Sequence, residues 1–276
     1  MVLIEIKHII NTSFLSSGKD LIFDNIVIKH PSVGEILALN NGILASRQYW
    51  QMVSLLTCDP YDKMVDLDDK GIDYQKVDNF DVFVFQWHNA LLKYAESDDE
   101  IKKIYNPLLS IQEALCFFFG VHKFDLVKVG NDLCIVDLDS IKNNMCGYCI
   151  TREVYNIFAE FLNAINDVDH SDRINPNNDS TKRMLIEDMR DELKRKSRIK
   201  NDELHKLDNY IGEMMNKVSF GGNGGVNIFN VNNLKIYQLI SAYKVVMNKY
   251  KADHLLNGIY AGTVDAKSIN EKELNW

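Results

Sequence analysis

The sequence lacks the features that most quickly identify a class of protein. Its 276 residues contain no apolar run that approaches the ~20 residues required for a membrane-spanning helix. Positive charge is not in excess: the formal net charge is −8, and acidic and basic residues are interspersed. Such a surface is poorly suited to neutralising phosphates. We therefore expect neither a membrane nor a nucleic acid as partner.

Cysteine is scarce and odd in number. The five cysteines lie mostly in apolar or strand-like segments, which is typical of reduced thiols and not of a disulfide framework. The first eight residues carry Glu5 and Lys7 inside an apolar run and have no small-residue cleavage site, unlike a signal peptide. We expect a cytoplasmic protein. The cysteines are Cys58, Cys116, Cys134, Cys146 and Cys149.

Catalytic signatures are missing as well. No nucleophile elbow or zinc-protease motif is present, and the seven histidines have no partner that is recognisable from spacing. The glycine-rich residues 221–225 lack the Lys-Ser/Thr of a phosphate-binding loop and indicate a linker. We expect no catalytic residue, no cofactor and no metal, and hence a protein that is not an enzyme.

Cys146 and Cys149 form the motif most like a chemical site. A C-x-x-C pair before a helix start can lower the pKa of one thiol and support disulfide exchange. A thioredoxin-like site needs the pair directly after a parallel strand, whereas Asn143 and Asn144 place it in a loop. A zinc site would need a second close pair of ligands, which is absent. A thiol-dependent enzyme remains only as a third alternative.

Two groups of aspartates could hold a divalent cation or serve as acid and base. Asp66, Asp68 and Asp69 fall in a charged helix or turn, and Asp137 and Asp139 fall at the end of an expected strand. Neither group has a partner that is recognisable from the sequence. We interpret both groups as solvated surface acids or helix caps.

Local patterns predict an α+β fold that is predominantly α-helical. The pairs Asp24-Asn25 and Gly130-Asn131 stand between short apolar segments and predict two antiparallel hairpins in the first half of the chain. Helices fill the rest of that half, and the second half is expected to be helical almost throughout.

Three helix starts have capping signals. Ser32 and Glu35 form a capping box, in which each side chain satisfies a free backbone N–H. Asn106 precedes a proline at the first helical position, and Thr151 caps a further helix. A helix from about Asn79 is expected to bury one apolar face, although residues 81–86 leave a strand as the alternative. That face comprises Phe80, Phe83, Trp87, Leu91 and Tyr94.

Composition divides the second half of the chain. Residues 166–180 are polar and predict a long loop, residues 181–200 predict a charged helix, and residues 220–225 predict a flexible connector before a last helix at about 233–257. We therefore expect a mixed α+β domain at 1–150, a helical region at 151–220 and a C-terminal helical segment at 226–276.

The charged helix contains the strongly basic residues 194–198. Glu192 with Lys196 and Asp191 with Arg195 have the i,i+4 spacing that supports an exposed helix. The helix is either a solvated zwitterionic face or an exposed arm that docks a partner.

The last helix carries an apolar stripe that could bind a partner helix. The alternative is that this stripe packs on the core. The stripe consists of Ile236, Ile240, Tyr243, Met247 and Tyr250.

Strings across most of the chain resemble proteins of tailed phages, or prophages, of Gram-positive bacteria. They occupy residues 29–36, 54–57 with Pro60 and Asp62, 67–74, 80–83, 150–155, 174–176, 234–239, 258–265 and 274–276. Such proteins are similar to those encoded in tail-morphogenesis gene clusters. The resemblance implies a tail assembly chaperone, which keeps the long helical tape measure protein soluble until tail-tube subunits surround it.

That resemblance sets the remaining expectations. The partners are other phage proteins, namely the tape measure or tail-tube proteins, and the location is the host bacterial cytoplasm. Many such chaperones are smaller than this chain, so a structural virion component of the tail, baseplate or neck is the alternative. A frameshift that extends the chain past Trp276 would favour the chaperone.

Overall fold

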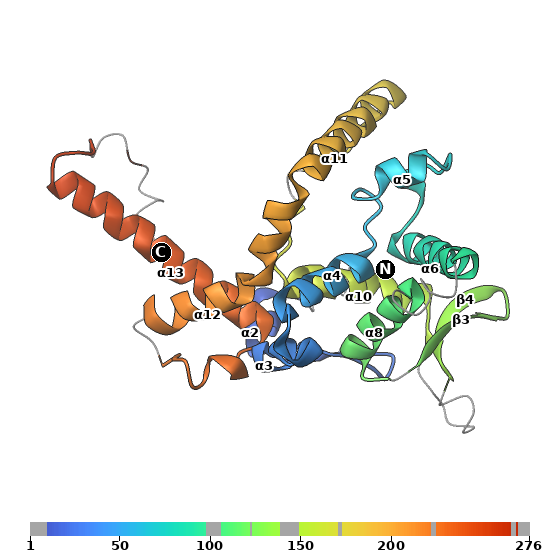
Figure 1. Cartoon of the computed structure of the whole chain (residues 1–276), viewed down its shortest axis with the longest axis horizontal. Coiled ribbons are helices and arrows are strands. Elements are labelled where there is room, and N and C mark those ends of the chain that lie inside the picture. The colour runs from blue at the N-terminus through green and yellow to red at the C-terminus, as the bar shows by residue number, and fades with distance from the viewer. Residues whose placement is uncertain are drawn as a thin grey trace.

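The computed structural model describes residues 10–97, 106–121, 123–138, 149–170, 173–221, 225–265 and 269, and in α11 it describes only the backbone of residues 197–206. These residues form ten α-helices and two small antiparallel sheets, which confirms the α+β, mostly helical class (Figure 1). The helices are α2 Thr12–Ser17, α3 Val33–Leu37, α4 Ala45–Thr57, α5 Met64–Asp68, α6 Asn79–Glu96, α8 Pro107–Phe119, α10 Arg152–Ile165, α11 Asp179–Asp208, α12 Tyr210–Gly221 and α13 Ile236–Tyr260. The strands are β1 Leu21–Phe23, β2 Ile26–Ile28, β3 Phe124–Val129, β4 Asp132–Asp137 and β5 Cys149–Ile150, and short 3-10 helices lie at η1 Leu39–Gly42, η2 Tyr74–Lys76 and η3 Val231–Asn233.

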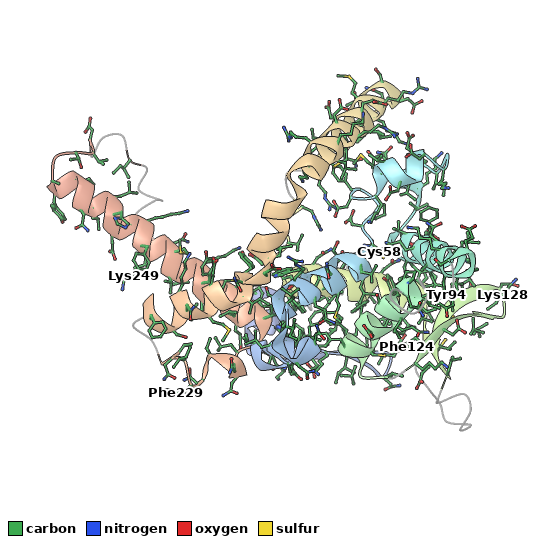
Figure 2. The ribbon with its side chains drawn as sticks, viewed as in Figure 1. Cys58, Tyr94, Phe124, Lys128, Phe229 and Lys249 are labelled. Carbon is green, nitrogen blue, oxygen red and sulfur yellow. The ribbon has the colours of Figure 1, made fainter. Side chains whose placement is uncertain are left out.

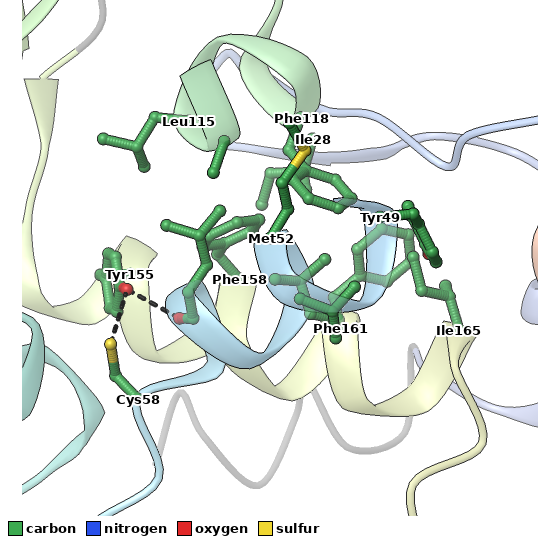
Figure 3. Packing of buried hydrophobic residues seen from close by; sticks show 14 of the residues in the cluster. Ile28, Tyr49, Met52, Cys58, Leu115, Phe118, Tyr155, Phe158, Phe161 and Ile165 are labelled. Carbon is green, nitrogen blue, oxygen red and sulfur yellow. Dashed lines mark hydrogen bonds between the residues drawn. The ribbon is translucent and has the colours of Figure 1, made fainter. Parts of the chain in front are cut away.

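Helices α4, α8 and α10 meet at the centre of the hydrophobic core (Figure 3), and α6 packs against α8 and α10. Aromatic side chains dominate it: the rings of Phe119 and Phe158 lie 4.6 Å apart, and those of Phe83 and Tyr155 lie 4.7 Å apart. The buried Tyr155 hydroxyl donates to the carbonyl of Leu56 at 2.7 Å, so its polar atom remains satisfied.

Both expected hairpins are present. In β1–β2, Asp24 and Asn25 adopt left-handed backbone conformations with φ of 48° and 62°, which the tight turn requires. In the turn between β3 and β4, Gly130 supplies the required positive φ, with a value of 64°. The two-residue strand β5 adds to β4 and was not expected.

The capping signals gave correct helix starts. Ser32 and Glu35 make the predicted reciprocal capping box, the Asn106 side chain accepts from the N–H groups of α8, and the Thr151 side chain accepts from Val154. The region from Asn79 is a helix, which settles the alternative between helix and strand. Its expected face is only partly buried, because Leu91 and Tyr94 lie exposed beyond the core.

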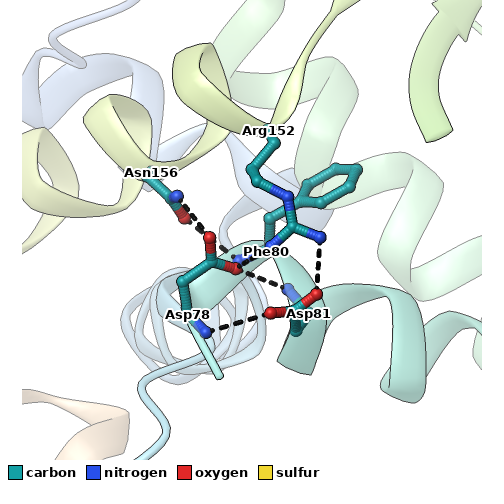
Figure 4. A network of polar contacts seen from close by, with 5 residues as sticks. All are labelled: Asp78, Phe80, Asp81, Arg152 and Asn156. Carbon is teal, nitrogen blue, oxygen red and sulfur yellow. Dashed lines mark hydrogen bonds and ion pairs between the residues drawn. The ribbon is translucent and has the colours of Figure 1, made fainter. Parts of the chain in front are cut away.

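A polar network joins α6 to α10 (Figure 4). Arg152 donates to Asp78 at 2.8 Å and to Asp81 at 2.6 Å, and these two aspartates also form the capping box of α6. Asn156 donates to Asp78 and accepts from the backbone N–H of Phe80. This network joins α10 to the preceding part of the chain. Residues on both sides of position 150 also belong to one hydrophobic cluster. The three-part domain division remains a prediction.

Helix α11 begins at Asp179, within the stretch expected to be a loop, and is held at both ends. Near its start, Lys182 pairs with Asp73, which directly precedes η2. Farther along its first half, Arg190 pairs at 2.8 Å with Asp69, which directly follows α5. At its end, the guanidinium of Arg47 on α4 binds both carboxylate oxygens of Asp208. At 30 residues, the helix is about 45 Å long.

The start of α13 is held by the N-terminal part of the chain. Val33 donates its N–H to the carbonyl of Leu234 at 2.8 Å, and Ile236 donates to the carbonyl of Pro31 at 3.0 Å. Farther along, α13 extends away from the helical core, with α12 beside its first half (Figure 1). The described part of the chain contains no helix that is long and apolar enough to cross a membrane.

Candidate functional site

Among the cysteines that the structure describes, Cys134 and Cys149 lie close together in the β3–β4–β5 sheet, whereas Cys58 follows α4 and Cys116 lies on α8. Cys149 lies on β5, directly opposite Val136, and Cys134 lies two residues from Val136 on the same face of β4. Burial, followed by the neighbouring Cys149, raises the pKa of Cys134 to about 11, so this thiol is protonated at neutral pH. Cys146 lies outside the described residues, so its distance from Cys149 is not part of the structure.

The aspartates near α5 serve the packing of α11. Asp68 and Asp69 both pair with Arg190, at 3.4 Å and 2.8 Å. Asp137 ends β4 and is buried, while Asp139 falls outside the described ranges. Across the residues that the structure describes, no three His, Cys, Asp or Glu side chains lie together as metal ligands.

The basic cluster of α11 is neutralised in part by its own helix. Lys194 pairs with Asp191 at 3.0 Å, and Lys196 pairs with Glu192 at 2.8 Å, the latter at the expected i,i+4 spacing. The side chains of residues 197 and 198 lie outside the described part of α11.

The apolar stripe of the last helix divides along α13. Ile236 and Ile240 belong to the hydrophobic core, where they have little surface to offer a partner. Tyr243 is half-buried against the core, whereas Met247 and Tyr250 lie farther out and line an open groove. Binding of a partner by these residues remains a prediction, and of the stripe only Met247 and Tyr250 line the groove.

This groove lies between the end of α12 and the outer half of α13, with a volume of about 1110 Å³. Its α12 wall includes Phe220 and Gly221, which were expected in the connector but form the last two residues of the helix. The groove is lined by Asn216, Lys217, Phe220, Gly221, Met247, Asn248, Tyr250, Lys251, His254 and Leu255.

Large apolar side chains are unusually exposed around this groove. Phe220 is 76% exposed and Tyr250 is 51% exposed. Nearby along the chain, Phe229 is 91% exposed in the connector that leads to η3, and it lies on the outside of the molecule in Figure 2. Clustered exposed apolar residues mark interaction surfaces more often than isolated ones do.

Two of the polar side chains that line the groove, Lys217 and Lys251, carry positive charge. Lys217 projects from α12, with its Nζ atom 5.4 Å from the centre of the Tyr243 ring and 3.5 Å from the Tyr243 hydroxyl. Lys251 and His254 project from α13 and are exposed. Among the described lining residues there is no aspartate or glutamate.

Sequence reasoning found one wall of the groove and missed the other. The stripe on α13 predicted Met247 and Tyr250, but Phe220 and Lys217 were not expected to face them. The signal available in the sequence was Phe220, because a large aromatic residue directly before a run of glycines is not typical of a flexible connector.

A family model described as the YomV second domain matches residues 200–276, which is less than a third of the chain. The matched part contains α12, α13 and every residue that lines the groove. Neither a curated protein nor a solved structure matches this chain.

Proposed function

We propose that this chain is a non-enzymatic phage assembly protein that binds a helical segment of another phage protein in the α12–α13 groove. The groove is the observation that carries the proposal, because it gathers large apolar side chains on an open surface. In finer terms the chain is a tail assembly chaperone. It holds the tape measure protein in the host cytoplasm until tail-tube subunits replace it.

Two further observations support this proposal. The match to the YomV second domain fits a phage-associated protein and covers the groove. A groove between two helices is also a common means of binding the apolar face of a third helix. A tape measure protein, long and helical, would present many such faces in succession.

A structural component of the virion is the second candidate. Phe229 and Phe220 are so exposed that they would suit a permanent contact in the tail, baseplate or neck. Mass spectrometry of purified particles separates the candidates, because a chaperone is absent from the finished virion. A slippery frameshift site near the end of the gene, followed by a gene for a very long helical protein, would favour the chaperone.

The binding test compares two substitutions on the same helix. Tyr250→Asp places a charge in the groove, while Val245→Asp places the same charge on α13 at a residue of similar exposure that does not line the groove, 49% against 51%. Both variants share the low helix propensity of aspartate. The full-length chains are purified and titrated with the product of the long downstream gene.

We expect Tyr250→Asp to weaken this complex by about 30-fold, the effect of losing one central interface aromatic, and Val245→Asp to leave it within about three-fold of the wild type. Equal affinity for all three chains would refute binding in the groove. Thermal unfolding of each variant shows whether the fold is intact.

A further inference from the structure

The dimensions of the groove fit one helix. Its α12 wall comes close to α13 at Gly221, where an added Cβ atom would lie 3.0 Å from Cγ1 of Val246 and 3.3 Å from Cε2 of Tyr250. The lining on α13 extends from Met247 to Leu255, about 12 Å along the helix. A ligand that lies along both walls would therefore contact them over roughly two helical turns.

The chemistry of the groove has an apolar part and a cationic part. Phe220, Met247, Tyr250 and Leu255 supply the apolar part, and they come from both helices. Amphipathic helices bind such surfaces through apolar residues at i, i+3, i+4 and i+7. The apolar side chains alone do not distinguish one amphipathic helix from another, so selectivity must come from the charges.

Those charges are positive on a chain that is negative overall. Lys217 lies on the α12 side, and Lys251 lies on the α13 side. Residues 210–260 contain five lysines against two acidic residues, whereas the whole chain has a net charge of −8. Carboxylates that flank the apolar stripe of a bound helix would therefore lie near lysines on both walls.

Two other occupants fit less well. In a two-fold contact between copies of this chain, Lys217 and Lys251 of one groove would face the same lysines of the other. For a nucleic acid, the net charge of −8 opposes binding, and Lys217 and Lys251 are the lysines that line the groove and could pair with phosphates.

We infer that the ligand of the α12–α13 groove is an amphipathic helix whose apolar stripe is flanked by glutamate or aspartate residues. This inference rests on the proposed function, and it narrows the partner to a segment with acidic flanks. Lys217 and Lys251 select that segment, and the apolar residues between them hold it.

The test uses two synthetic helical peptides with the same leucine stripe. Glutamate flanks the stripe in one peptide and lysine flanks it in the other. Binding to the full-length chain is followed by fluorescence anisotropy at low and high salt. The double variant Lys217→Glu/Lys251→Glu is compared with Lys123→Glu/Lys128→Glu, which changes the net charge equally at the β3–β4 hairpin, far from the groove (Figure 2).

We expect the wild type to bind the glutamate peptide at least about 10-fold more tightly at low salt, with a smaller preference at high salt. Lys217→Glu/Lys251→Glu should reverse this preference, and the hairpin control should retain it. Equal affinity for both peptides, or an unchanged preference in the groove variant, would overturn the inference. Tighter binding of a single-stranded oligonucleotide, or a dimer that Tyr250→Asp dissociates, would overturn it in favour of another occupant.

The results also separate this inference from the proposed function. If Tyr250→Asp loses the downstream partner while the two peptides bind equally, the acidic ligand is refuted and groove binding stands. If Tyr250→Asp keeps the partner at full affinity while the glutamate peptide binds selectively, the selectivity is supported and the proposed function is refuted.

Discussion

His30 is fully buried beside Phe161, with the two rings 5.9 Å apart and nearly perpendicular. Among the residues that the structure describes, neither ring nitrogen has a hydrogen bond of normal geometry, although the backbone of Lys19 lies near the ring. The charge of Lys235 disfavours a protonated ring. The backbone of Lys19 favours the protonated ring in part, and so does the carboxylate of Asp20, which accepts the backbone N–H of His30 at 2.8 Å. The fold therefore accommodates His30 in its neutral form.

This environment makes the stability of the protein depend on pH. Burial, followed by the charge of Lys235, lowers the pKa of His30 from 6.5 to about 4. Between these two values the unfolded chain binds a proton that the folded chain does not. The stabilising contribution of neutral His30 is therefore complete above pH 6.5 and is lost as the pH falls towards 4. A difference of roughly 2.5 pKa units corresponds to about 3 kcal/mol of unfolding free energy.

The substitution His30→Leu removes this titration while keeping a side chain of similar volume beside Phe161. Urea unfolding, followed by circular dichroism at a series of pH values, gives the unfolding free energy of both proteins. As the pH is lowered from 7.5 to 4, we expect the unfolding free energy of the variant to rise by about 3 kcal/mol relative to that of the wild type. Carboxylates also titrate in this range. Burial alone would raise the pKa of Glu35, but hydrogen bonds with Lys29 and Ser32 lower it to about 2. Such groups titrate in both proteins, so their contributions cancel in the difference between the two unfolding free energies.

A packing defect would shift the variant by the same amount at every pH, so it cannot imitate the expected change. Parallel stability curves from pH 7.5 to pH 4 would show that His30 does not titrate on unfolding, and would refute the burial argument. If the wild type instead became more stable relative to the variant at low pH, the pKa of His30 would be raised by the fold and not lowered, and the argument would be wrong.

Three other predictions concern the core and the groove. Asp78→Ala removes the N-cap of α6 and a partner of Arg152, and should lower the unfolding free energy by about 2 kcal/mol in urea titrations. Burial raises the pKa of the Cys58 thiol to about 12, so at about pH 8 a thiol reagent should modify it only after denaturant is added, as mass spectrometry would show. Gly221→Ala should crowd Tyr250 and weaken binding of the glutamate peptide several-fold in the anisotropy assay, without a matching loss of thermal stability.

The elements that could be predicted from the sequence are those with local causes. The capping box of Ser32 and the turn at Asp24-Asn25 involve contacts within a few residues, so the sequence contains the whole interaction. Strand β5 has no such signal. It consists of two residues, and its existence depends on pairing with β4, which ends at Asp137.

The predictions of buried faces on α6 and α13 were partly wrong because both helices extend beyond the core. The stripe of α6 begins with the buried Phe80 and ends with the exposed Tyr94, and that of α13 begins with the buried Ile236 and ends with the exposed Tyr250. In each case the periodicity is correct along the whole helix. It cannot show where the helix passes the edge of the core, because that edge is formed by other elements.

The groove could not be predicted for the same reason, and its exposure supports a binding role. The stripe continues for about two turns beyond the half-buried Tyr243. There Tyr250, with Phe220 of α12 nearby, exposes apolar surface to water. Shortening or polar substitution there would leave the core of α10 and α4 unchanged. An exposed apolar surface at that position is what the proposed binding of a partner helix requires.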